Sequence, residues 1–406
     1  MNGKTKDFLD RHMINPDCVD MDKLCSFIIN EMENGLEGKK SSMPMIDSYC
    51  SPDFDAKPGK KVAVIDAGGT NFRTCIVSFD EKGNPVIEDF KKSRMPGIDR
   101  QVTAEEFFNI IADEVERLID KTDRIGFCFS YAAKILPNGD GVPLTFSKEI
   151  KAPEVVGKEL GKELFKVLES RGHNMSGKKI IILNDTVTTL LAGLPVARQM
   201  GCDSCIGFIL GTGTNTAYVH KTTIINEESG NLSFALGDID KQFIDSTLNP
   251  NTYHFEKMIS GAYLGLSGHF VLKQAQQEGL FSQSFKLPET MNTISMSNFL
   301  EEKENPFCGG EPEDLDICKD ILKAFIFRAA KLTAASLAAT VLVTDFGKKQ
   351  PVLVNADGTT FYKTIYLREQ TEKYLNGYLA KHGRSAKFTQ IENAPTIGSA
   401  IGALSL

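Results

Sequence analysis

Two strand–turn–strand patterns stand out in the alternation of apolar and polar positions along the chain. The first begins after Lys61 with VAVID, turns through AGGTN and returns as FRTCIVSF, and the second reads CIGFIL, GTGTN and TAYVH. Short β-rich runs on both sides of a glycine turn predict two β-hairpins. Placing Thr214 on Thr70 superimposes the turns at an offset of 144 residues. We interpret this as a weak internal duplication of two α/β halves, with chance similarity of two Gly/Thr turns as the alternative.

Helical spacing of apolar residues accounts for much of the remaining chain. Leu24, Phe27, Ile28 and Met32 share one face of an expected helix in the N-terminal sixty residues. Residues 103–120 predict an amphipathic helix with Thr103 as its N-cap. Further expected elements are the strands RIGFCFS, KIIILND and PVLVNADG, helices over 251–274 and 318–343, an acidic loop over 301–314 and a closing small-residue segment, TIGSAIGALSL.

Length and composition restrict the class of protein. A chain of 406 residues favours two domains with a cleft between them. A net charge of −7 without a Lys/Arg block argues against nucleic acid as the main partner and favours small molecules. The apolar stretch 332–343 is too short to span a bilayer. Of the nine cysteines only Cys202 and Cys205 have CxxC spacing, and without a second pair this is typical of reduced thiols. We therefore expect a cytoplasmic protein without a membrane partner.

The glycine turns of the two hairpins are candidate phosphate sites. In DAGGTN, residues 66–71, glycines let backbone N–H groups approach a phosphate, while Asp66 faces Mg²⁺ or its waters. GTGTN, residues 211–215, adds the Thr212 hydroxyl, suited to the β- and γ-phosphates. Each turn alone is equally typical of a plain hairpin. Two such turns at matching places favour a nucleotide held from both sides.

A third motif, IIILNDT, brings Asn184, Asp185 and Thr186 to the junction of a buried strand and the apolar helix VTTLLAGL. Asp or Thr at this place is typical of a helix N-cap. The functional alternative is a general base, since in phosphoryl transfer a carboxylate accepts the proton of the attacking hydroxyl. Neither a P-loop nor the protein-kinase signatures are present, because GHNMSGKK at 172–179 lacks the final Ser/Thr and precedes its strand.

With these motifs the chain resembles the hexokinase family almost from end to end. VIDAGGTNFRTCIV is similar to the family's first phosphate motif, IIILNDTVTTLLAG to its catalytic segment and FILGTGTNTAYV to its second phosphate motif. VLVNADGTTFYK and GSAIGALSL resemble its adenosine region, and NEMENGLEG its N-terminal helix. The resemblance implies that the chain binds ATP with Mg²⁺ and phosphorylates a hexose.

The resemblance assigns residues 130–148 to sugar binding. This segment matches the family's sequence pattern only in part. The family's usual Ser-Phe-Pro is Ser130-Tyr131-Ala132 here, and its Trp-Thr-Lys is Phe146-Ser147-Lys148. Downstream, NEESG at 226–230 resembles the family's Asn-x-Glu-Trp-Gly, with Ser229 in place of the tryptophan. The whole chain has no Trp, and only GALSL follows Ile401, so the family's last helix is shortened.

The resemblance implies three groups of site residues. Asp185 is the base and Lys148 a second catalytic residue that neutralises the transferring phosphoryl group or holds a sugar hydroxyl. The expected sugar ligands are Ser130, Ser147, Lys148, Asn184, Asp185, Asn215, Glu228 and Glu256. The expected nucleotide ligands are Asp66, which also serves Mg²⁺ through water, with Gly68, Gly69, Thr70, Asn71, Arg73, Gly211, Thr212, Gly213, Asp357, Gly358, Gly398 and Ser399.

The implied fold is the actin-like ATPase (ribonuclease H-like) fold, with two α/β domains and ATP in the cleft. The small domain takes 61–184 and about 391–406, and the large domain 1–60 and 185–390. Two rivals stay open: a catalytically silent sugar sensor, indicated by the changes at Tyr131, Ala132 and Ser229, and a chaperone-like or filament ATPase. Intact Asp66 and Asp185 argue against the first, and the expected sugar ligands against the second.

Overall fold

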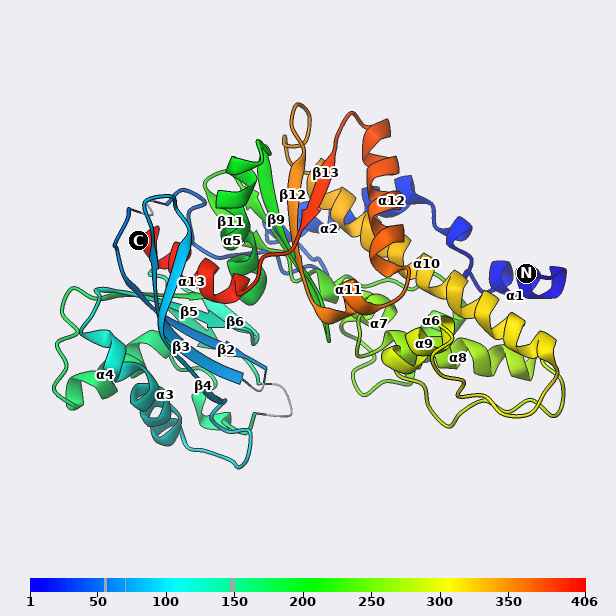
Figure 1. Cartoon of the computed structure of the whole chain (residues 1–406), viewed down its shortest axis with the longest axis horizontal. Helices are drawn as coiled ribbons and strands as arrows, with labels where there is room; N and C mark the ends of the chain where they lie inside the picture. Colours follow the sequence, from blue (N-terminus) through cyan, green and yellow to red (C-terminus); the bar gives the residue numbers. More distant parts are fainter. Residues whose placement is uncertain (55–56, 70, 147–149) are drawn as a thin grey trace.

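Two sheets organise the chain into two lobes (Figure 1). The computed structural model describes residues 1–54, 57–69, 71–146 and 150–406. In the small lobe a five-stranded sheet has the order β4-β3-β2-β5-β8. Its strands are β2 (Val62–Gly68), β3 (Asn71–Phe79), β4 (Pro85–Arg94), β5 (Arg124–Phe129) and β8 (Lys179–Leu183).

The large lobe contains a six-stranded sheet of order β1-β11-β10-β9-β12-β13. Its strands are β1 (Ile46–Asp47), β9 (Ser204–Leu210), β10 (Thr214–His220), β11 (Thr223–Asn226), β12 (Val352–Asp357) and β13 (Ala386–Thr389). Both predicted hairpins are confirmed, since β2 pairs antiparallel with β3 and β9 with β10.

The two sheets repeat one topology. In each, three antiparallel strands are followed by two parallel ones, so that β4-β3-β2-β5-β8 corresponds to β11-β10-β9-β12-β13. A helix after the last strand of each set leads to the other lobe: α5 (Asp185–Gln199) packs on β9, and α13 (Ala394–Leu404) packs on β5 and β2. The internal duplication predicted from the two turns is therefore present at the level of the fold.

Helices cover the sheets and supply most of the core. The small lobe carries α3 (Ala104–Ile119) and α4 (Leu160–Ser170) beside the short hairpin β6 (Ala133–Ile135) and β7 (Gly141–Pro143). Thr103 caps α3 as predicted, within a capping box completed by Glu106. The large lobe carries α1 (Gly3–Arg11), α2 (Met21–Leu36), α6 (Asp238–Asp245), α7 (His254–Ile259), α8 (Leu264–Gln277), α9 (Thr293–Leu300), α10 (Pro312–Leu342), α11 (Thr359–Lys363) and α12 (Leu367–Lys381).

Helix α10 is the longest helix of the described chain, with 31 residues. By length and composition it could cross a membrane, but 83% of its apolar window is buried inside the large lobe. It begins at Pro312, ahead of the expected start at residue 318, because Pro at N1 and acidic residues in the first turn favour helix initiation there. Its burial is typical of the core helix of a globular domain.

Two other expectations about elements were wrong. The single helix expected over 251–274 is broken between α7 and α8, since Ser260 has extended backbone and the N–H groups of Gly261 and Ala262 bond to the carbonyls of Gly211 and Thr212. The elements α11, α12 and β13 were not predicted, because α12 has a weak apolar periodicity and β13 contains only four residues. The break after α7 proves to be part of the site.

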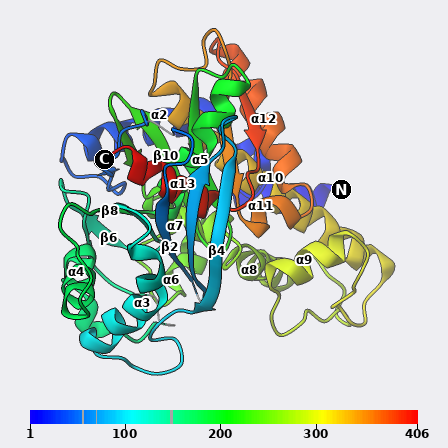
Figure 2. The same cartoon turned by 60° about the vertical axis from the view of Figure 1, so that its left-hand side comes forward.

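The helices α5 and α13 lie against each other where the lobes meet (Figure 2). Gly398 of α13 permits this approach, since a Cβ there would lie 1.8 Å from the carbonyl oxygen of Thr188 on α5. The C-terminus lies on the small lobe and the N-terminus at the far end of the large lobe (Figure 1). These positions agree with the general arrangement expected from the sequence, while the domain boundaries given above stay a prediction.

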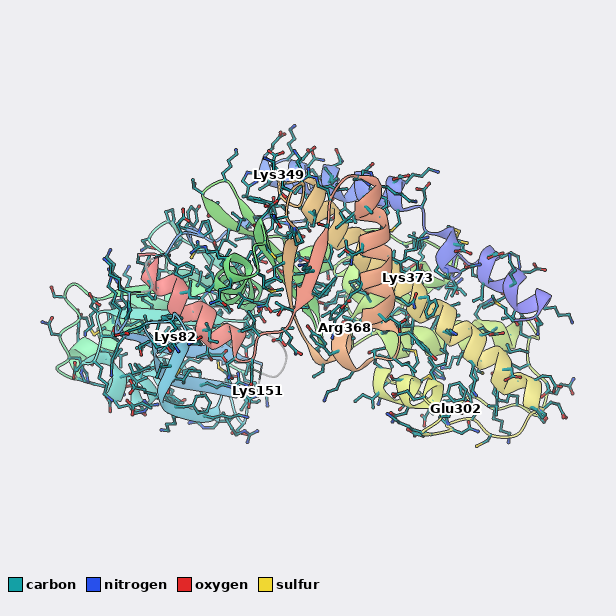
Figure 3. All side chains as sticks on the ribbon, turned by 45° about the horizontal axis from the view of Figure 1, so that its top comes forward. Lys82, Lys151, Glu302, Lys349, Arg368 and Lys373 are labelled. Atoms are coloured by element: carbon teal, nitrogen blue, oxygen red, sulfur yellow. The ribbon has the colours of Figure 1, made fainter. Side chains whose placement is uncertain are left out.

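Charged side chains cover both lobes (Figure 3). The labelled Lys82 and Lys151 of the small lobe and Glu302, Lys349, Arg368 and Lys373 of the large lobe lie at the surface. Few carboxyl groups are fully buried, and Asp66 on β2 is one of them. Asp185, Glu228 and Glu256 are half-buried. These four carboxyl groups belong to the candidate site.

Candidate active site

The turn between β2 and β3 is built around Asp66. Its carboxylate is 3% exposed and accepts a hydrogen bond of 2.7 Å from Arg73 across the strand pair. Burial raises the pKa of Asp66, and the Arg73 guanidinium opposes that rise. Gly69 has φ +55°, a conformation that glycine adopts without strain, and Gly68 pairs with Asn71 to close the hairpin. Thr70 lies outside the described residues.

The turn between β9 and β10 is closed on one side by Glu256 of α7. The Glu256 carboxylate accepts a 3.0 Å hydrogen bond from the backbone N–H of Thr214. A Cβ on Gly213 would lie 2.5 Å from a carboxylate oxygen of Glu256, so a larger residue here would displace that carboxylate. The Gly211 carbonyl accepts hydrogen bonds from Gly261 N–H and the Thr360 hydroxyl, each 2.8 Å long. Thr212 is exposed on the outer side of the turn.

Asp185 is the first residue of α5, and it does not cap the helix. The N-cap is Asn184, whose side-chain oxygen accepts a 2.8 Å hydrogen bond from the N–H of Thr186. The prediction that Asp or Thr fills the cap was therefore wrong, and the carboxylate of Asp185 is left for another role. Burial raises its pKa to about 6, while hydrogen bonds from Ser130 and Thr186 oppose that rise.

A chain of amide side chains connects the start of α5 to Glu228. The Asn215 amide donates to the side-chain oxygen of Asn184 at 3.4 Å and to that of Asn226 at 2.7 Å. Asn226 in turn donates to the Glu228 carboxylate at 2.9 Å. The structure thus connects three predicted sugar ligands, Asn184, Asn215 and Glu228, through Asn226. Asn226 is the first residue of the NEESG motif but was not among the predicted site residues. Each amide is oriented by its neighbour.

Glu228 has a left-handed backbone with φ +52° and ψ +44°. Such a conformation in a non-glycine residue costs free energy and is enriched at functional sites. Burial raises the pKa of Glu228, the hydrogen bond from Asn226 lowers it, and the negative charge of Asp185 raises it further. The pKa of Glu256 is raised chiefly by burial, with a smaller contribution from the charge of Glu228. Glu228 therefore lies within electrostatic range of both Asp185 and Glu256.

Tyr253 is a further residue beside these carboxyl groups. It also has a left-handed backbone, with φ +57° and ψ +39°, at the start of α7. Its pKa is raised by burial and by the charges of Glu228 and Glu256. The loop before it is held by the buried ammonium of Lys257, which donates to the carbonyls of Asn249 and Thr252 at 2.5 and 2.8 Å. No motif pointed to Tyr253, because its backbone conformation and its neighbours are set only by the fold.

The sugar segment joins the site through Ser130. Its backbone N–H donates to the Ala67 carbonyl at 3.2 Å, and its hydroxyl lies near Asp185 and Gly68. One cavity is lined by Tyr131 and Ala133 of this segment together with Asn184, Asn226 and Glu228. The sugar segment and the amide chain therefore face one space. Ser147 and Lys148 lie outside the described residues.

A cavity of about 820 Å³ opens on the outer side of the second turn. It is large enough for a nucleotide, since small-molecule pockets span about 300–1,000 Å³. Asp357 is the last residue of β12 and pairs with Ile209 of β9. Gly358 follows with φ +117° and contacts Leu210. Asp357 and Gly358 therefore lie next to Gly211 of the second turn. Residues that line the cavity but were not predicted come from the helix break, α9 and α11, far apart in sequence: Gly261, Ala262, Thr293, Ser297, Asn298, Thr359, Thr360 and Lys363.

Gly398 and Ser399 are not among the residues that line this cavity. Both are buried in α13, where Gly398 contacts Thr188 and the Ser399 hydroxyl donates to the Pro395 carbonyl at 2.7 Å. The prediction that they bind the nucleotide is therefore not supported by their positions. Small residues there allow α13 to pack closely on α5 and β5.

The oxygen ligands near the first turn fit Mg²⁺ held through water. Mg²⁺ usually binds one or two carboxylates and completes its shell with waters and substrate phosphates. Asp66 supplies such a carboxylate, and no group of three or more metal-ligating side chains occurs in the described part of the chain. A magnesium ion would therefore reach the site with its nucleotide, as Asp66 alone forms no dedicated cage.

Two sheets of repeated topology, each with a glycine turn between two of its antiparallel strands, are typical of the actin-like ATPase fold. Two hexokinase family models match residues 5–194 and 205–405, which together include almost the whole chain. The chain belongs to the hexokinase family. This confirms the resemblance stated from the motifs.

Individual relatives are distant. Hexokinase-2 of rice is 28% identical over 437 aligned positions, which cover 92% of this chain and 84% of the relative. Hexokinase-1 of rat is 27% identical over 377 positions that cover 82% of this chain but only 40% of the rat protein's length. The structure of a Schistosoma mansoni hexokinase complexed with glucose aligns over 99% of both chains, with a TM-score of 0.76 and 22% identity. At this identity the structural likeness supports the fold alone.

Proposed function

We propose that this chain transfers the γ-phosphate of ATP to the 6-hydroxyl of a hexose, glucose or a related sugar, in the cytoplasm. The observation that carries the proposal is the position of Asp185. Its carboxyl group lies at the start of α5, does not cap the helix and has a pKa raised to about 6 by burial. A general base works best when its pKa lies near the working pH.

In the proposed reaction Asp185 accepts the proton of the sugar 6-hydroxyl. The hydroxyl oxygen forms a bond to the γ-phosphorus, the bond from that phosphorus to the bridging oxygen of ADP breaks, and ADP leaves with the electron pair. The transition state is loose, so positioning and charge stabilisation contribute more than covalent chemistry. Mg²⁺ bound to the phosphates would neutralise part of their charge.

The proposed sugar ligands suit a polyhydroxylated ring. Glu228 and Glu256 are carboxylates, and Asn184 and Asn215 are amides already oriented by hydrogen bonds. Each of these groups can bind two adjacent hydroxyls. A sugar that lacks the matching hydroxyl would leave a half-buried group unpaired, which penalises the wrong substrate. Lys148 and Ser147 stay assigned to this function by the family resemblance.

The nucleotide is proposed to lie between the two turns with its adenosine in the cavity of about 820 Å³. The backbone N–H groups of both turns and the Thr212 hydroxyl would face the phosphates. Asp357 and Gly358 lie beside the second turn, between β9 and β10, and stay proposed nucleotide ligands. Gly398 and Ser399 contribute to helix packing and are not proposed as ligands.

The proposal is tested by incubating the purified protein with Mg-ATP and a panel of hexoses and amino sugars, beside the variant Asp185→Asn. We expect transfer to at least one hexose, and a kcat lower by about 10²- to 10⁴-fold in the variant, the range of general base catalysis. Transfer to no sugar would leave the sensor or the partner-driven ATPase as the function. Equal kcat in both proteins would remove Asp185 from its role.

A pH profile distinguishes a lost base from a damaged fold. Only the carboxylate form of Asp185 accepts a proton, so kcat/KM of the unmodified protein should fall as pH drops below about 6. The residual activity of Asp185→Asn should lack this acid limb. The matched control is Asp99→Asn, which changes an exposed carboxylate paired with Arg94 and should keep both kcat and the profile.

A further inference from the structure

The hydroxyl group of Tyr131 connects the sugar segment to the first phosphate turn. It donates a hydrogen bond of 2.5 Å to the carbonyl oxygen of Gly69. The family's usual residue here is phenylalanine, which has no such donor, so the contact depends on the tyrosine of this chain. The next residue is Ala132 in place of the usual proline, which removes a constraint on the backbone of the same segment.

The ring of Tyr131 is fixed without help from its hydroxyl. It is 8% exposed and packs against the rings of Phe129 and Phe146, whose centroids lie 5.1 and 5.3 Å away. Aromatic pairs at these distances stabilise a defined orientation. Loss of the hydroxyl alone should therefore leave the ring in place and remove the contact with Gly69.

Gly69 lies in the tightest part of the turn. Its φ of +55° is a left-handed conformation, and no other hydrogen bond to its carbonyl is found among the described residues. Because a peptide group is planar, holding its carbonyl oxygen holds the whole group in one orientation. Phosphate binding by a glycine turn depends on such orientation of its peptide groups.

We propose that Tyr131 is a positioning residue that orders the first phosphate turn through the Gly69 carbonyl and thereby aligns the γ-phosphate with the sugar. This inference rests on the proposed kinase function, because it assigns the turn to ATP phosphates. Tyr131 acts through Gly69, so its hydroxyl is expected to affect the nucleotide parameters and kcat more than the affinity for the sugar.

The test compares the unmodified protein with Tyr131→Phe in steady-state kinetics, varying Mg-ATP at saturating hexose and hexose at saturating Mg-ATP. We expect kcat/KM for ATP to fall about 2- to 12-fold, the effect of one hydrogen bond between neutral groups. The KM for the hexose should change less than about 2-fold, because the ring of Tyr131, which lines the cavity with the proposed sugar ligands, stays in place. Nucleotide binding is also titrated directly with a fluorescent ATP analogue and Mg²⁺, which requires no turnover.

The control is Tyr218→Phe on β10 of the large lobe. Tyr218 is 1% exposed, and its hydroxyl has no hydrogen-bond partner among the described residues. This variant removes a buried tyrosine hydroxyl that makes no contact with either turn and should leave the kinetic parameters of ATP unchanged.

Two outcomes would overturn the inference. One is an ATP affinity and kcat in Tyr131→Phe equal to those of the unmodified protein, and the other is a loss of hexose affinity as large as the loss for ATP. If no hexose is phosphorylated, the proposed function fails, and the analogue titration then decides on its own whether Tyr131 orders a nucleotide site. Weaker analogue binding in Tyr131→Phe but not in Tyr218→Phe would support it.

Discussion

At the residue scale, the neighbouring residues Glu227 and Glu228 have different environments: Glu227 lies in the core, whereas Glu228 is a proposed sugar ligand. Glu228 is half-buried and bonded to Asn226 at the proposed sugar site. Glu227 is fully buried, and one of its oxygens accepts a 2.8 Å hydrogen bond from Thr340 of α10. Its other oxygen has no partner among the described residues. A buried carboxyl with one unpaired oxygen is more stable protonated.

The environment of Glu227 predicts a pH-dependent contribution to stability. Burial raises its pKa from 4.5 to about 8, so between these values the folded chain holds a proton that the unfolded chain has released. Stability from this group is complete below about pH 4.5 and is lost as pH rises toward 8. Within that window the free energy of unfolding should fall by up to about 1.4 kcal/mol per pH unit.

The variant Glu227→Gln should be free of this dependence. Urea unfolding followed by circular dichroism at several pH values should give a flatter profile than that of the unmodified protein. Glu81→Gln, in the exposed turn after β3, is the control and should keep the original slope. Parallel profiles for the unmodified protein and Glu227→Gln would contradict the assignment of the proton to this residue.

At the element scale, we expect the contact of α5 with α13 to fix the position of the carboxylate proposed as the base. Asp185 is the first residue of α5, and Gly398 of α13 approaches the carbonyl of Thr188 one turn further along. Alanine at Gly398 would place a Cβ 1.8 Å from that oxygen. We expect Gly398→Ala to destabilise the protein by about 1–3 kcal/mol, the usual effect of overpacking, and to lower kcat by displacing Asp185.

The control for this prediction is Gly377→Ala on α12. Apart from the backbone of its own helix, no heavy atom of the described residues lies within 4 Å of the place that a Cβ on Gly377 would occupy. Because Gly377 lies in a helix interior, alanine there should stabilise the fold by up to about 1 kcal/mol. Urea unfolding and kcat are measured for both variants. If Gly398→Ala were as stable and active as Gly377→Ala, the close packing of α13 on α5 would not position the site.

Elements with strong local signals could be predicted from the sequence, and those fixed by tertiary contacts could not. The hairpins and the cap at Thr103 follow from turn glycines and capping chemistry, and both are confirmed. The break after Ile259 was missed because its cause is a backbone pairing with Gly211, much earlier in the chain. Gly398 was assigned to the nucleotide by its motif, although its environment is set by α5, a helix distant in sequence.

At the scale of the whole molecule, the proposed sugar ligands are divided between the lobes. Ser130 belongs to the small lobe, Asp185 begins the helix that leads from it, and Glu228 and Glu256 belong to the large lobe. A ligand that contacts both lobes binds more tightly when the lobes are closed, because it then makes contacts with each of them. The free energy of these additional contacts favours the closed arrangement. Closure would also exclude water from the γ-phosphate. The helices α13 and α5 pack against each other between the lobes.

We therefore expect hexose binding to close the lobes and reduce the radius of gyration measured by small-angle X-ray scattering. Binding itself is checked by thermal unfolding, since hexose at about 100 times its Kd should stabilise the fold by about 2.7 kcal/mol. The variant Glu256→Gln removes the charge of a proposed sugar ligand on the large lobe. A higher hexose concentration should then be needed for the same reduction in the radius of gyration. A hexose that stabilises the protein without changing its radius would show that the site is complete before the sugar arrives, and that water is excluded by some means other than closure.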